Sequence, residues 1–307
     1  MTERPAVIEE APGRYNRYLA VINDYITLTK PPIILLLLIT AAGGMFLAAQ
    51  GLPSLPLLGI VWIGGALASA GANAINHQID RDIDLIMTRT SKRPVASQRI
   101  TPGKALAFGI ILNVVAFLVL VTWVNLLAAL LTLSATLFYV FIYTLWLKRS
   151  TPQNIVIGGA AGSIPPLVGW AAVTGGIDLP AVYLFTIVFF WTPPHFWALS
   201  LLIQEDYEKA RIPMLPVVAT RDYTTLNVFL YTIVLVGITL AFAYSTSVHG
   251  IYLCSALILG GMFLVLSWRL KRSSTRKLAR TVYLFSLLYL ALLFVAIMVD
   301  TMVPILF

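Results

Sequence analysis

Long apolar runs recur along the chain and are separated by short polar segments. A helix needs roughly 20 apolar residues to cross a bilayer, and nine runs reach about that length. We expect these runs to span a membrane over residues 27–49, 57–77, 105–123, 125–147, 153–174, 180–203, 226–245, 249–270 and 282–304. The pattern therefore predicts an all-α integral membrane protein with nine transmembrane helices.

The positions of the basic residues test this topology. Lysine and arginine accumulate in the cytoplasmic loops of membrane proteins. With nine spans and a cytoplasmic N-terminus, all 21 lysines and arginines fall on one side of the membrane. We therefore expect a cytoplasmic tail over residues 1–24 and a C-terminus on the outer side. No segment of separate composition occurs, so residues 1–307 are expected to form a single polytopic domain.

Composition narrows the class further. Hydrophobic residues make up 59% of the 307 residues, far above a soluble protein. The net charge of +8 suits an anionic cytoplasmic leaflet, and no continuous basic stripe for nucleic acid occurs. A single cysteine excludes an intramolecular disulfide. The first 18 residues resemble neither a secretory signal nor a transit peptide, so we expect a cell inner (cytoplasmic) membrane protein.

A dense block of charges, NAINHQIDRDIDLIMTRTSKRP, directly follows the second apolar run. Asn76, Asp80 and Asp84 are four residues apart, so on a helix all three share one face. Asp82 would point elsewhere. Such a ladder of oxygen atoms suits Mg²⁺, which takes one or two carboxylates and completes its shell with water and phosphate oxygens.

Basic residues close to this ladder would supply positive charge for a phosphate group. The candidate diphosphate-binding residues are Arg89, Lys92, Arg93, Lys30 and Arg211. The alternative is a solvated helix end, where charges gather because water is available. Small residues in the preceding run favour tight packing, so that the polar face would look into a protein cavity, where ionisable groups are functional candidates.

A second acidic helix end follows the sixth run. Pro193 and Pro194 are expected to break or kink this helix, and Pro165 and Pro166 to do so in the run before it. The acids beyond the sixth run are Glu205, Asp206 and Glu208. Two acidic ends on one side of the membrane could hold one or two Mg²⁺ bridged by a diphosphate, which would neutralise a leaving group. Which of these carboxylates faces inward stays open; Glu205 and Asp206 are the candidate metal ligands.

Two histidines lie near these segments. His195 follows the proline pair inside an aromatic run. It could ligate a haem iron, hold a haem propionate, or bond to a carbonyl that the prolines leave free. His77 lies about 100° around the helix from Asn76, so we expect it to be a packing residue with its polar atoms satisfied.

The charge block resembles the N-x-x-x-D-x-x-x-D and R-T-x-x-R-P motifs of the intramembrane prenyltransferases of the UbiA superfamily. Two later stretches, TPQNIVIGGAAGSIPPLVGWAAVTG and TPPHFWALSLLIQEDYEKARIPMLPVV, are similar to its haem O synthase branch. Together these motifs span much of residues 73–219. The chain departs from many superfamily members in one respect, because QEDYE stands where they carry a second D-x-x-x-D.

The resemblance implies nine helices around a central cavity and a Mg²⁺-dependent reaction. The farnesyl group of farnesyl diphosphate would be transferred to a vinyl group of haem B, with water addition, giving haem O and diphosphate. Haem B would be a substrate and not a cofactor. The residues that would act on Mg²⁺–diphosphate are Asn76, Asp80, Asp84, Asp206, Arg89 and Arg93, and His195 is the candidate for haem binding. Aromatic residues that could stabilise an allylic cation are Tyr139, Tyr143, Trp170, Trp191, Phe196 and Trp197.

Expected partners are farnesyl diphosphate, haem B and the lipid bilayer, with a homo-oligomer or a haem A synthase as further candidates. Three other readings stay open. A related enzyme could use an aromatic or quinone-precursor acceptor, and a haem-binding protein could be non-catalytic. A transporter would place polar groups through the membrane depth, whereas nearly all charge is expected on one side and the only charged residues of the outer half are Asp178 and Asp300.

Overall fold

A computed structural model of the chain describes residues 14–245 and 248–303. Within these residues nine helices are long and apolar enough to cross a membrane, and no β-strand occurs. They cover Pro31–Ala49, Leu55–Ile79, Pro102–Trp123, Leu126–Ser150, Asn154–Thr174, Leu179–Ser200, Arg221–Tyr244, Gly250–Ser273 and Arg276–Met302. The nine predicted spans are thereby confirmed, with ends that differ from the prediction by at most six residues.

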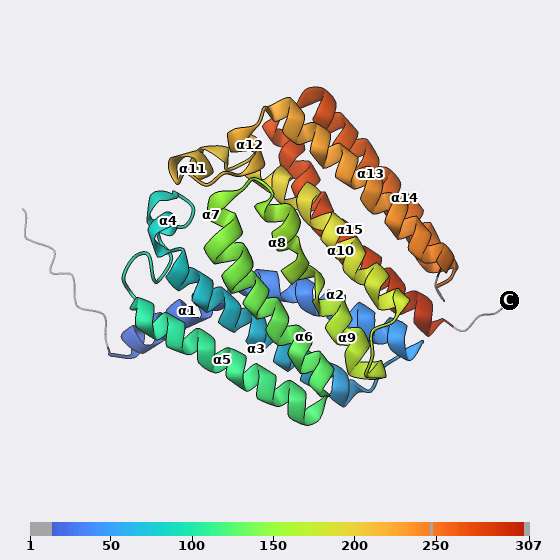
Figure 1. Cartoon of the computed structure of the whole chain (residues 1–307), viewed down its shortest axis with the longest axis horizontal. Helices are drawn as coiled ribbons and strands as arrows, with labels where there is room; N and C mark the ends of the chain where they lie inside the picture. Colours follow the sequence, from blue (N-terminus) through green and yellow to red (C-terminus); the bar gives the residue numbers. More distant parts are fainter. Residues whose placement is uncertain (1–13, 246–247, 304–307) are drawn as a thin grey trace, which may run out of the picture.

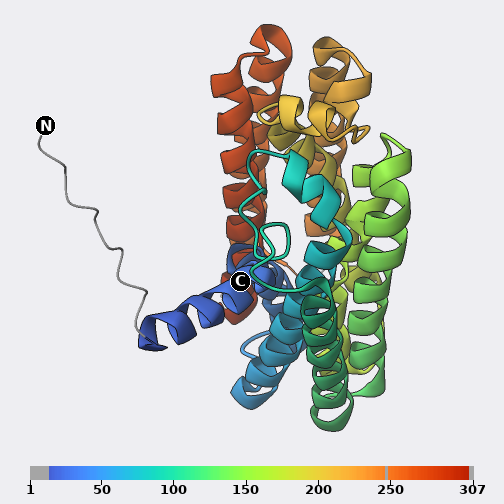
Figure 2. The same cartoon turned by 90° about the vertical axis from the view of Figure 1, so that its left-hand side faces the viewer.

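The spans lie side by side, and the short polar helices gather at one end of the bundle (Figure 1). The single-helix spans are α2 (Pro31–Ala49), α3 (Leu55–Ile79), α5 (Pro102–Trp123), α10 (Leu179–Ser200), α13 (Arg221–Ser245), α14 (Gly250–Ser273) and α15 (Arg276–Met302). The composite spans are α6 (Leu126–Leu137) with η1 (Phe138–Leu147) and α7 (Lys148–Ser150), and α8 (Asn154–Ser163) with α9 (Pro165–Thr174). At the end that we call the polar end lie α4 (Arg81–Ile86), α11 (Gln204–Lys209) and α12 (Leu215–Val218). Figure 2 views the bundle from this side.

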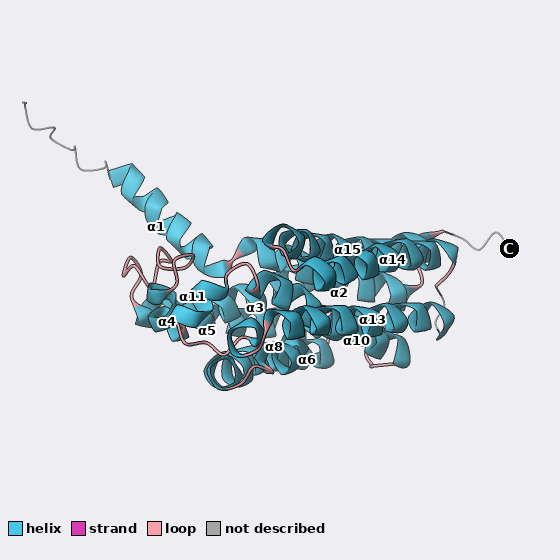
Figure 3. Ribbon diagram, turned by 90° about the horizontal axis from the view of Figure 1, so that it is seen from above, coloured by secondary structure: helices cyan, strands magenta, loops and turns pink. Residues whose placement is uncertain are grey.

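The first helix, α1 (Arg14–Thr29), leaves the bundle at the polar end (Figure 3). The chain turns at Lys30, which has a positive φ of 52°, and Pro31 and Pro32 then begin α2 because proline suits the first helical turn. Thr27–Thr29, which we expected in the first span, therefore belong to α1. Residues 14–24 of the predicted tail are helical, while residues 1–13 lie outside the described residues.

The two proline pairs behave differently. A break between α8, which ends at Ser163, and α9, which begins at Pro165, agrees with the prediction for the fifth span. In the sixth span, α10 continues from Leu179 to Ser200 with both prolines inside it, so Pro193 and Pro194 do not end the helix.

The fourth span contains a π-helical segment, η1, that the sequence did not predict. The hydroxyl of Thr144 donates to the carbonyl of Tyr139, five residues earlier, at 2.8 Å. A π-helix adds a residue to each turn and rotates all side chains beyond it, and such segments are frequent at functional sites. Here it turns Thr144 and Lys148 toward α3.

Glycine allows α2 and α9 to cross closely. A Cβ atom on Gly169 would lie 1.9 Å from the carbonyl oxygen of Ala41, and one on Gly44 would lie 2.2 Å from that of Pro166. Both obstacles are backbone atoms, which cannot rotate away as a side chain could. The crossing therefore requires glycine at both positions, as is common between membrane helices.

We expect Gly169→Ala to destabilise the protein by roughly 1–3 kcal/mol, the usual cost of overpacking. Gly59→Ala in α3 is the matched control, because nothing lies within 4 Å of its added Cβ. That control should be neutral or slightly stabilising, since alanine favours a helix. Unfolding in mixed micelles measures both variants, and equal stability of the two would contradict the close crossing.

Candidate active site

Asn76, Asp80 and Asp84 form a buried polar ladder at the end of α3. Their exposed fractions are 3%, 0% and 2%. Although α3 ends at Ile79 and α4 begins at Arg81, the amide of Asp80 bonds to the carbonyl of Asn76 at 2.9 Å, and the amide of Asp84 to that of Asp80 at 2.8 Å. The helical register therefore continues, and the three side chains share one face. The amide nitrogen of Asn76 donates to Asp80 at 2.8 Å and to Thr144 at 3.3 Å.

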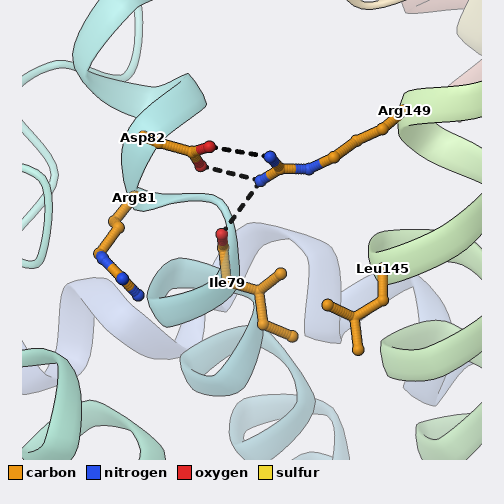
Figure 4. A pocket seen from close by; sticks show the side chains of 5 residues that line it. All are labelled: Ile79, Arg81, Asp82, Leu145 and Arg149. Atoms are coloured by element: carbon orange, nitrogen blue, oxygen red, sulfur yellow. Dashed lines mark hydrogen bonds and ion pairs between the residues drawn. The ribbon is translucent and has the colours of Figure 1, made fainter.

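Asp82 points away from this ladder, as the helical spacing predicted. Its two carboxylate oxygens accept hydrogen bonds from the guanidinium of Arg149, both at 2.8 Å (Figure 4). These bonds lower the pKa of the Asp82 carboxyl. The pair lines a cavity of about 390 Å³ together with Ile79, Arg81 and Leu145. Asp82 thus lies outside the ladder, although its partner Arg149 also comes within 3.9 Å of Asp80.

Three cations from separate elements neutralise the ladder. Lys30 donates to the carbonyl oxygen of the Asn76 side chain at 2.8 Å. Lys148 donates to Asp80, and Arg93 donates to both oxygens of Asp84 at 2.8 and 2.9 Å. Sequence reasoning identified Lys30 and Arg93 but missed Lys148, because the π-helix that aims it has no sequence pattern that we recognise.

The ladder carries more positive than negative charge when all its groups are ionised, since three cations face two carboxylates. Burial, together with the positive charges of Arg93 and Lys148, lowers the pKa of the Lys30 ammonium to about 7. A bound anion would relieve this repulsion and favour the charged form of Lys30. The arrangement is therefore suited to an anionic ligand.

The second acidic helix end lies beside the segment that follows α4. The carboxylate of Asp206, on α11, accepts hydrogen bonds from the backbone amides of Thr88 at 3.2 Å and Arg89 at 3.3 Å. Burial opposes ionisation of this carboxyl, but these hydrogen bonds outweigh it and lower the pKa of Asp206. Glu205 and Glu208 are exposed. Asp206 thus connects α11 to the backbone that follows α4.

The remaining basic candidates lie at the surface of the polar end. Arg89, Lys92 and Arg211 are exposed, and none of their side chains forms an ion pair within residues 14–245 and 248–303. They are free to approach an anion, in contrast to Lys30 and Arg93. Their assignment to diphosphate stays a prediction.

The ladder offers an oxygen atom for a metal ion. Oδ1 of Asp80 is buried and has no hydrogen-bond partner, and the nearest guanidinium nitrogen, of Arg149, is 3.9 Å away. Among the described residues no three His, Cys, Asp or Glu side chains are close enough to hold a metal alone. This donor set fits Mg²⁺, which takes few carboxylates and keeps waters or phosphate oxygens.

Aromatic rings lie beside the ladder on the fourth span. Tyr139 and Tyr143 stack with centroids 5.6 Å apart. A Cβ on Gly158 would lie 2.3 Å from the ring of Tyr143, so glycine lets α8 approach this ring. Tyr207 on α11 packs near Ile83 of α4, and burial raises the pKa of its hydroxyl.

His195 lies on α10 against α15. Its Nδ1 is 2.7 Å from the hydroxyl of Ser286, so the ring bonds to a serine and not to a carbonyl freed by the prolines. His77 differs from our expectation. It is buried, but neither of its ring nitrogens has a hydrogen-bond partner, so its polar atoms are not satisfied.

The structure is a helical membrane bundle with a buried polar ladder at one end, and comparisons with known proteins give its family. Residues 37–297 match the model of the UbiA prenyltransferase family, and the chain belongs to this family. It is 52% identical to a protoheme IX farnesyltransferase of Gloeobacter violaceus, over 93% of this chain and 94% of that protein. It is 49% identical to the protein of that name from Synechocystis, over 92% and 90% of the two chains.

Solved structures share the fold. The structure of a digeranylgeranylglyceryl phosphate synthase superposes with a TM-score of 0.75 at 18% identity, covering 92% of this chain and 98% of that one. A UbiA homolog from Archaeoglobus fulgidus, bound to GPP and Mg²⁺, gives a TM-score of 0.64 at 16% identity, covering 89% and 99%. At such identities the likeness concerns the fold alone.

We expect Arg93→Ala to lower the free energy of unfolding by about 3 kcal/mol. The variant leaves the carboxylate of Asp84, whose side chain is 3% exposed, without its cation. The matched control is Asp82→Ala, which removes the ion-pair partner of Arg149 at an exposed site. This control should lower the free energy of unfolding by only about 0–1 kcal/mol. Unfolding in mixed micelles separates the two variants. An Arg93→Ala protein as stable as the Asp82→Ala protein would show that the ladder does not need its cation.

Proposed function

We propose that the protein transfers the farnesyl group of farnesyl diphosphate to a vinyl group of haem B, with addition of water, to give haem O and diphosphate. The observation that carries this proposal is the identity of about half of all residues, over nearly the whole chain, with proteins named protoheme IX farnesyltransferase. The buried ladder supports it, because a buried site with metal ligands and excess cations suits a diphosphate leaving group.

In this proposal the ladder exchanges partners when substrate binds. Asn76, Asp80 and Asp84 would hold Mg²⁺, whose positive charge would favour the departure of the diphosphate. Lys30, Lys148 and Arg93 then turn from the ladder to the diphosphate oxygens. The ammonium and guanidinium groups stabilise the negative charge that develops as the C–O bond breaks. Arg89, Lys92 and Arg211, which are exposed at the polar end, would add positive charge.

A second ion would be held by Glu205 and Asp206. The carboxylate of Asp206 accepts hydrogen bonds from two backbone amides. A metal ion could therefore bind only if these hydrogen bonds break or if the ion shares a carboxylate oxygen with an amide. Asp206→Asn keeps an oxygen for the amides but loses the charge. We therefore expect it to raise the Mg²⁺ concentration needed for activity, with maximal turnover less affected.

The carbon–carbon bond needs no strong base in the protein. The electron pair of the C–O bond leaves with diphosphate, and the vinyl π electrons bond to the farnesyl carbon. Water adds to the cation beside the porphyrin and loses a proton. Stacked Tyr139 and Tyr143 present aromatic faces that stabilise a cation, and the apolar surroundings keep water from the allylic cation before transfer.

We further propose that the polar end faces the cytoplasm of a cell inner membrane, since the lysines and arginines of the described residues lie in or beside the segments that join the spans at that end. Residues 1–307 would then form one domain with the active site at the cytoplasmic leaflet and the C-terminus outside. A homo-oligomer and a haem A synthase partner stay predictions.

We expect Asp80→Asn and Asp84→Asn each to lower haem O formation at least about 100-fold. Each substitution removes the negative charge of a carboxylate that would bind the metal ion, and with it the stabilisation of the leaving group. Asp82→Asn is the matched control, since it lies on the same segment but bonds to Arg149; its activity should stay within a few-fold of wild type. Membranes supplied with haem B, Mg²⁺ and labelled farnesyl diphosphate provide the assay.

The same assay separates the alternatives. Label in a quinone precursor and none in haem would show that the acceptor is wrong. Haem binding without any prenylated product would indicate a non-catalytic protein. Full activity of both ladder variants would contradict the metal site, and so would full activity of the wild type in excess chelator.

A further inference from the structure

A groove with a volume of about 770 Å³ lies between α3, α5 and the fourth span, which pack against one another (Figure 1). Most of the residues that line it are hydrophobic. Three of them, Val114, Leu118 and Phe141, are each more than half exposed. Exposed apolar surface of this kind on a membrane bundle faces lipid, so the groove opens toward the bilayer.

The groove has the length of one leaflet. Its lining on α5 runs from Leu106 near the polar end to Leu118, and on the fourth span from Leu145 to Leu133. Twelve residues of α-helix rise about 18 Å, and half of the hydrocarbon core of a bilayer is about 15 Å thick. The groove is therefore long enough to hold a hydrocarbon chain of a single leaflet along the spans.

The polar side chains inside the groove bond to the protein itself. The side-chain amide of Asn113 donates to the carbonyl of Gly109 at 2.9 Å, and its oxygen accepts a hydrogen bond from the hydroxyl of Thr136 at 2.8 Å. Because a polar group that already has its partners does not require water, the interior of the groove suits an apolar chain.

Arg81 stands at the polar end of the groove. It lines both this groove and the 390 Å³ cavity described above. Its guanidinium donates to the carbonyl of Gln78 at 3.1 Å, and in the part of the chain that the structure describes it forms no ion pair. Figure 4 shows this guanidinium apart from the pair of Asp82 and Arg149. Arg81 is exposed and can therefore meet an anion.

The charges at this end leave one positive charge unmatched. Arg149 is already paired with Asp82 through two hydrogen bonds of 2.8 Å, so the charge of Arg81 remains. The phosphodiester of a phospholipid carries a single negative charge, and its oxygens fit the fork of a guanidinium. A prenyl diphosphate carries several negative charges, which the cations of the ladder would balance better. The end of the groove is thus matched to a phospholipid.

The groove and the ladder use different faces of α3. Ile75, Gln78 and Ile79 line the groove, whereas Asn76 and Asp80 do not. An occupant of the groove would therefore leave the candidate active site free.

We propose that this groove binds one anionic phospholipid of the leaflet at the polar end. An acyl chain lies between α5 and the fourth span, and the phosphate bonds to Arg81. The lipid fills apolar surface beside the helix that carries the ladder. This proposal goes beyond the proposed reaction and does not depend on the identity of the acceptor.

Lipid binding to the purified full-length protein, counted by native mass spectrometry, tests the proposal. The protein is stripped of lipid and titrated with phosphatidylglycerol or with phosphatidylcholine of the same chain length. The wild type should bind phosphatidylglycerol at least about fivefold more tightly than phosphatidylcholine. Arg81→Gln should weaken binding of phosphatidylglycerol about fivefold, the effect of one basic side chain on an anionic lipid. Arg280→Gln is the matched control, because Arg280 is also exposed and forms no ion pair among the described residues; it should bind phosphatidylglycerol as the wild type does.

A second pair of variants tests the groove itself. Val114→Trp places a large ring in the groove and should bind one phosphatidylglycerol fewer per chain than the wild type. Val115→Trp is its control, since Val115 is the next residue of α5 and is exposed but does not line the groove; it should keep the wild-type number.

Equal binding by Val114→Trp and Val115→Trp would overturn the proposal, as would equal binding by Arg81→Gln and Arg280→Gln. Displacement of the bound phosphatidylglycerol by farnesyl diphosphate would also overturn it, because the groove would then accept the prenyl substrate. A dimer that excludes the lipid, and that Val114→Trp abolishes, would overturn it in favour of a second copy of the chain. None of these outcomes bears on haem O formation, which is measured separately.

Discussion

The structure depends on the neutralisation of two buried carboxylates by cations from three separate elements. An isolated buried carboxylate is costly, and breaking a buried ion pair costs more than the pair itself contributes. Asp80 and Asp84 are tolerated because Lys148 and Arg93 bond to them, while Lys30 bonds to the neighbouring Asn76. In the proposed function, the groups that stabilise the buried ladder are also those that would bind the diphosphate. Folding and substrate binding would then depend on one set of charges.

Each cation reaches the ladder through a local departure from regular helix. Lys30 stands at the turn between α1 and α2 with a positive φ, Lys148 follows the π-helix, and Arg93 comes from the segment after α4. Such departures occur where function requires a side chain that a regular helix would aim elsewhere. The close crossing of α2 and α9 at Gly44 and Gly169 holds the span that carries Lys30 at its start.

The spans and the ladder were predictable because the first follow from the length of the apolar runs and the second from helical periodicity. Runs of about 20 apolar residues define the nine helices, and a spacing of four places Asn76, Asp80 and Asp84 on one face and Asp82 on another. Lys148 was not predictable, since no sequence pattern specifies a π-helix. Nor was Ser286, which meets His195 across 91 residues of chain. Of the break or kink expected at Pro193 and Pro194, the break does not occur. The expectation that the ring nitrogens of His77 are satisfied was wrong, because the sequence does not display the tertiary packing that surrounds this ring.

The central proposal is that Mg²⁺ replaces Lys30, Lys148 and Arg93 on the ladder while these three cations move to the diphosphate. Binding of a non-reactive farnesyl thiodiphosphate, measured by calorimetry with and without Mg²⁺, tests it most directly, because coupling between two ligands must be reciprocal. The account predicts an affinity for the analogue at least about tenfold higher with Mg²⁺ than without it, and no such gain in Asp80→Asn. Equal affinity of the wild type with and without Mg²⁺ would contradict it.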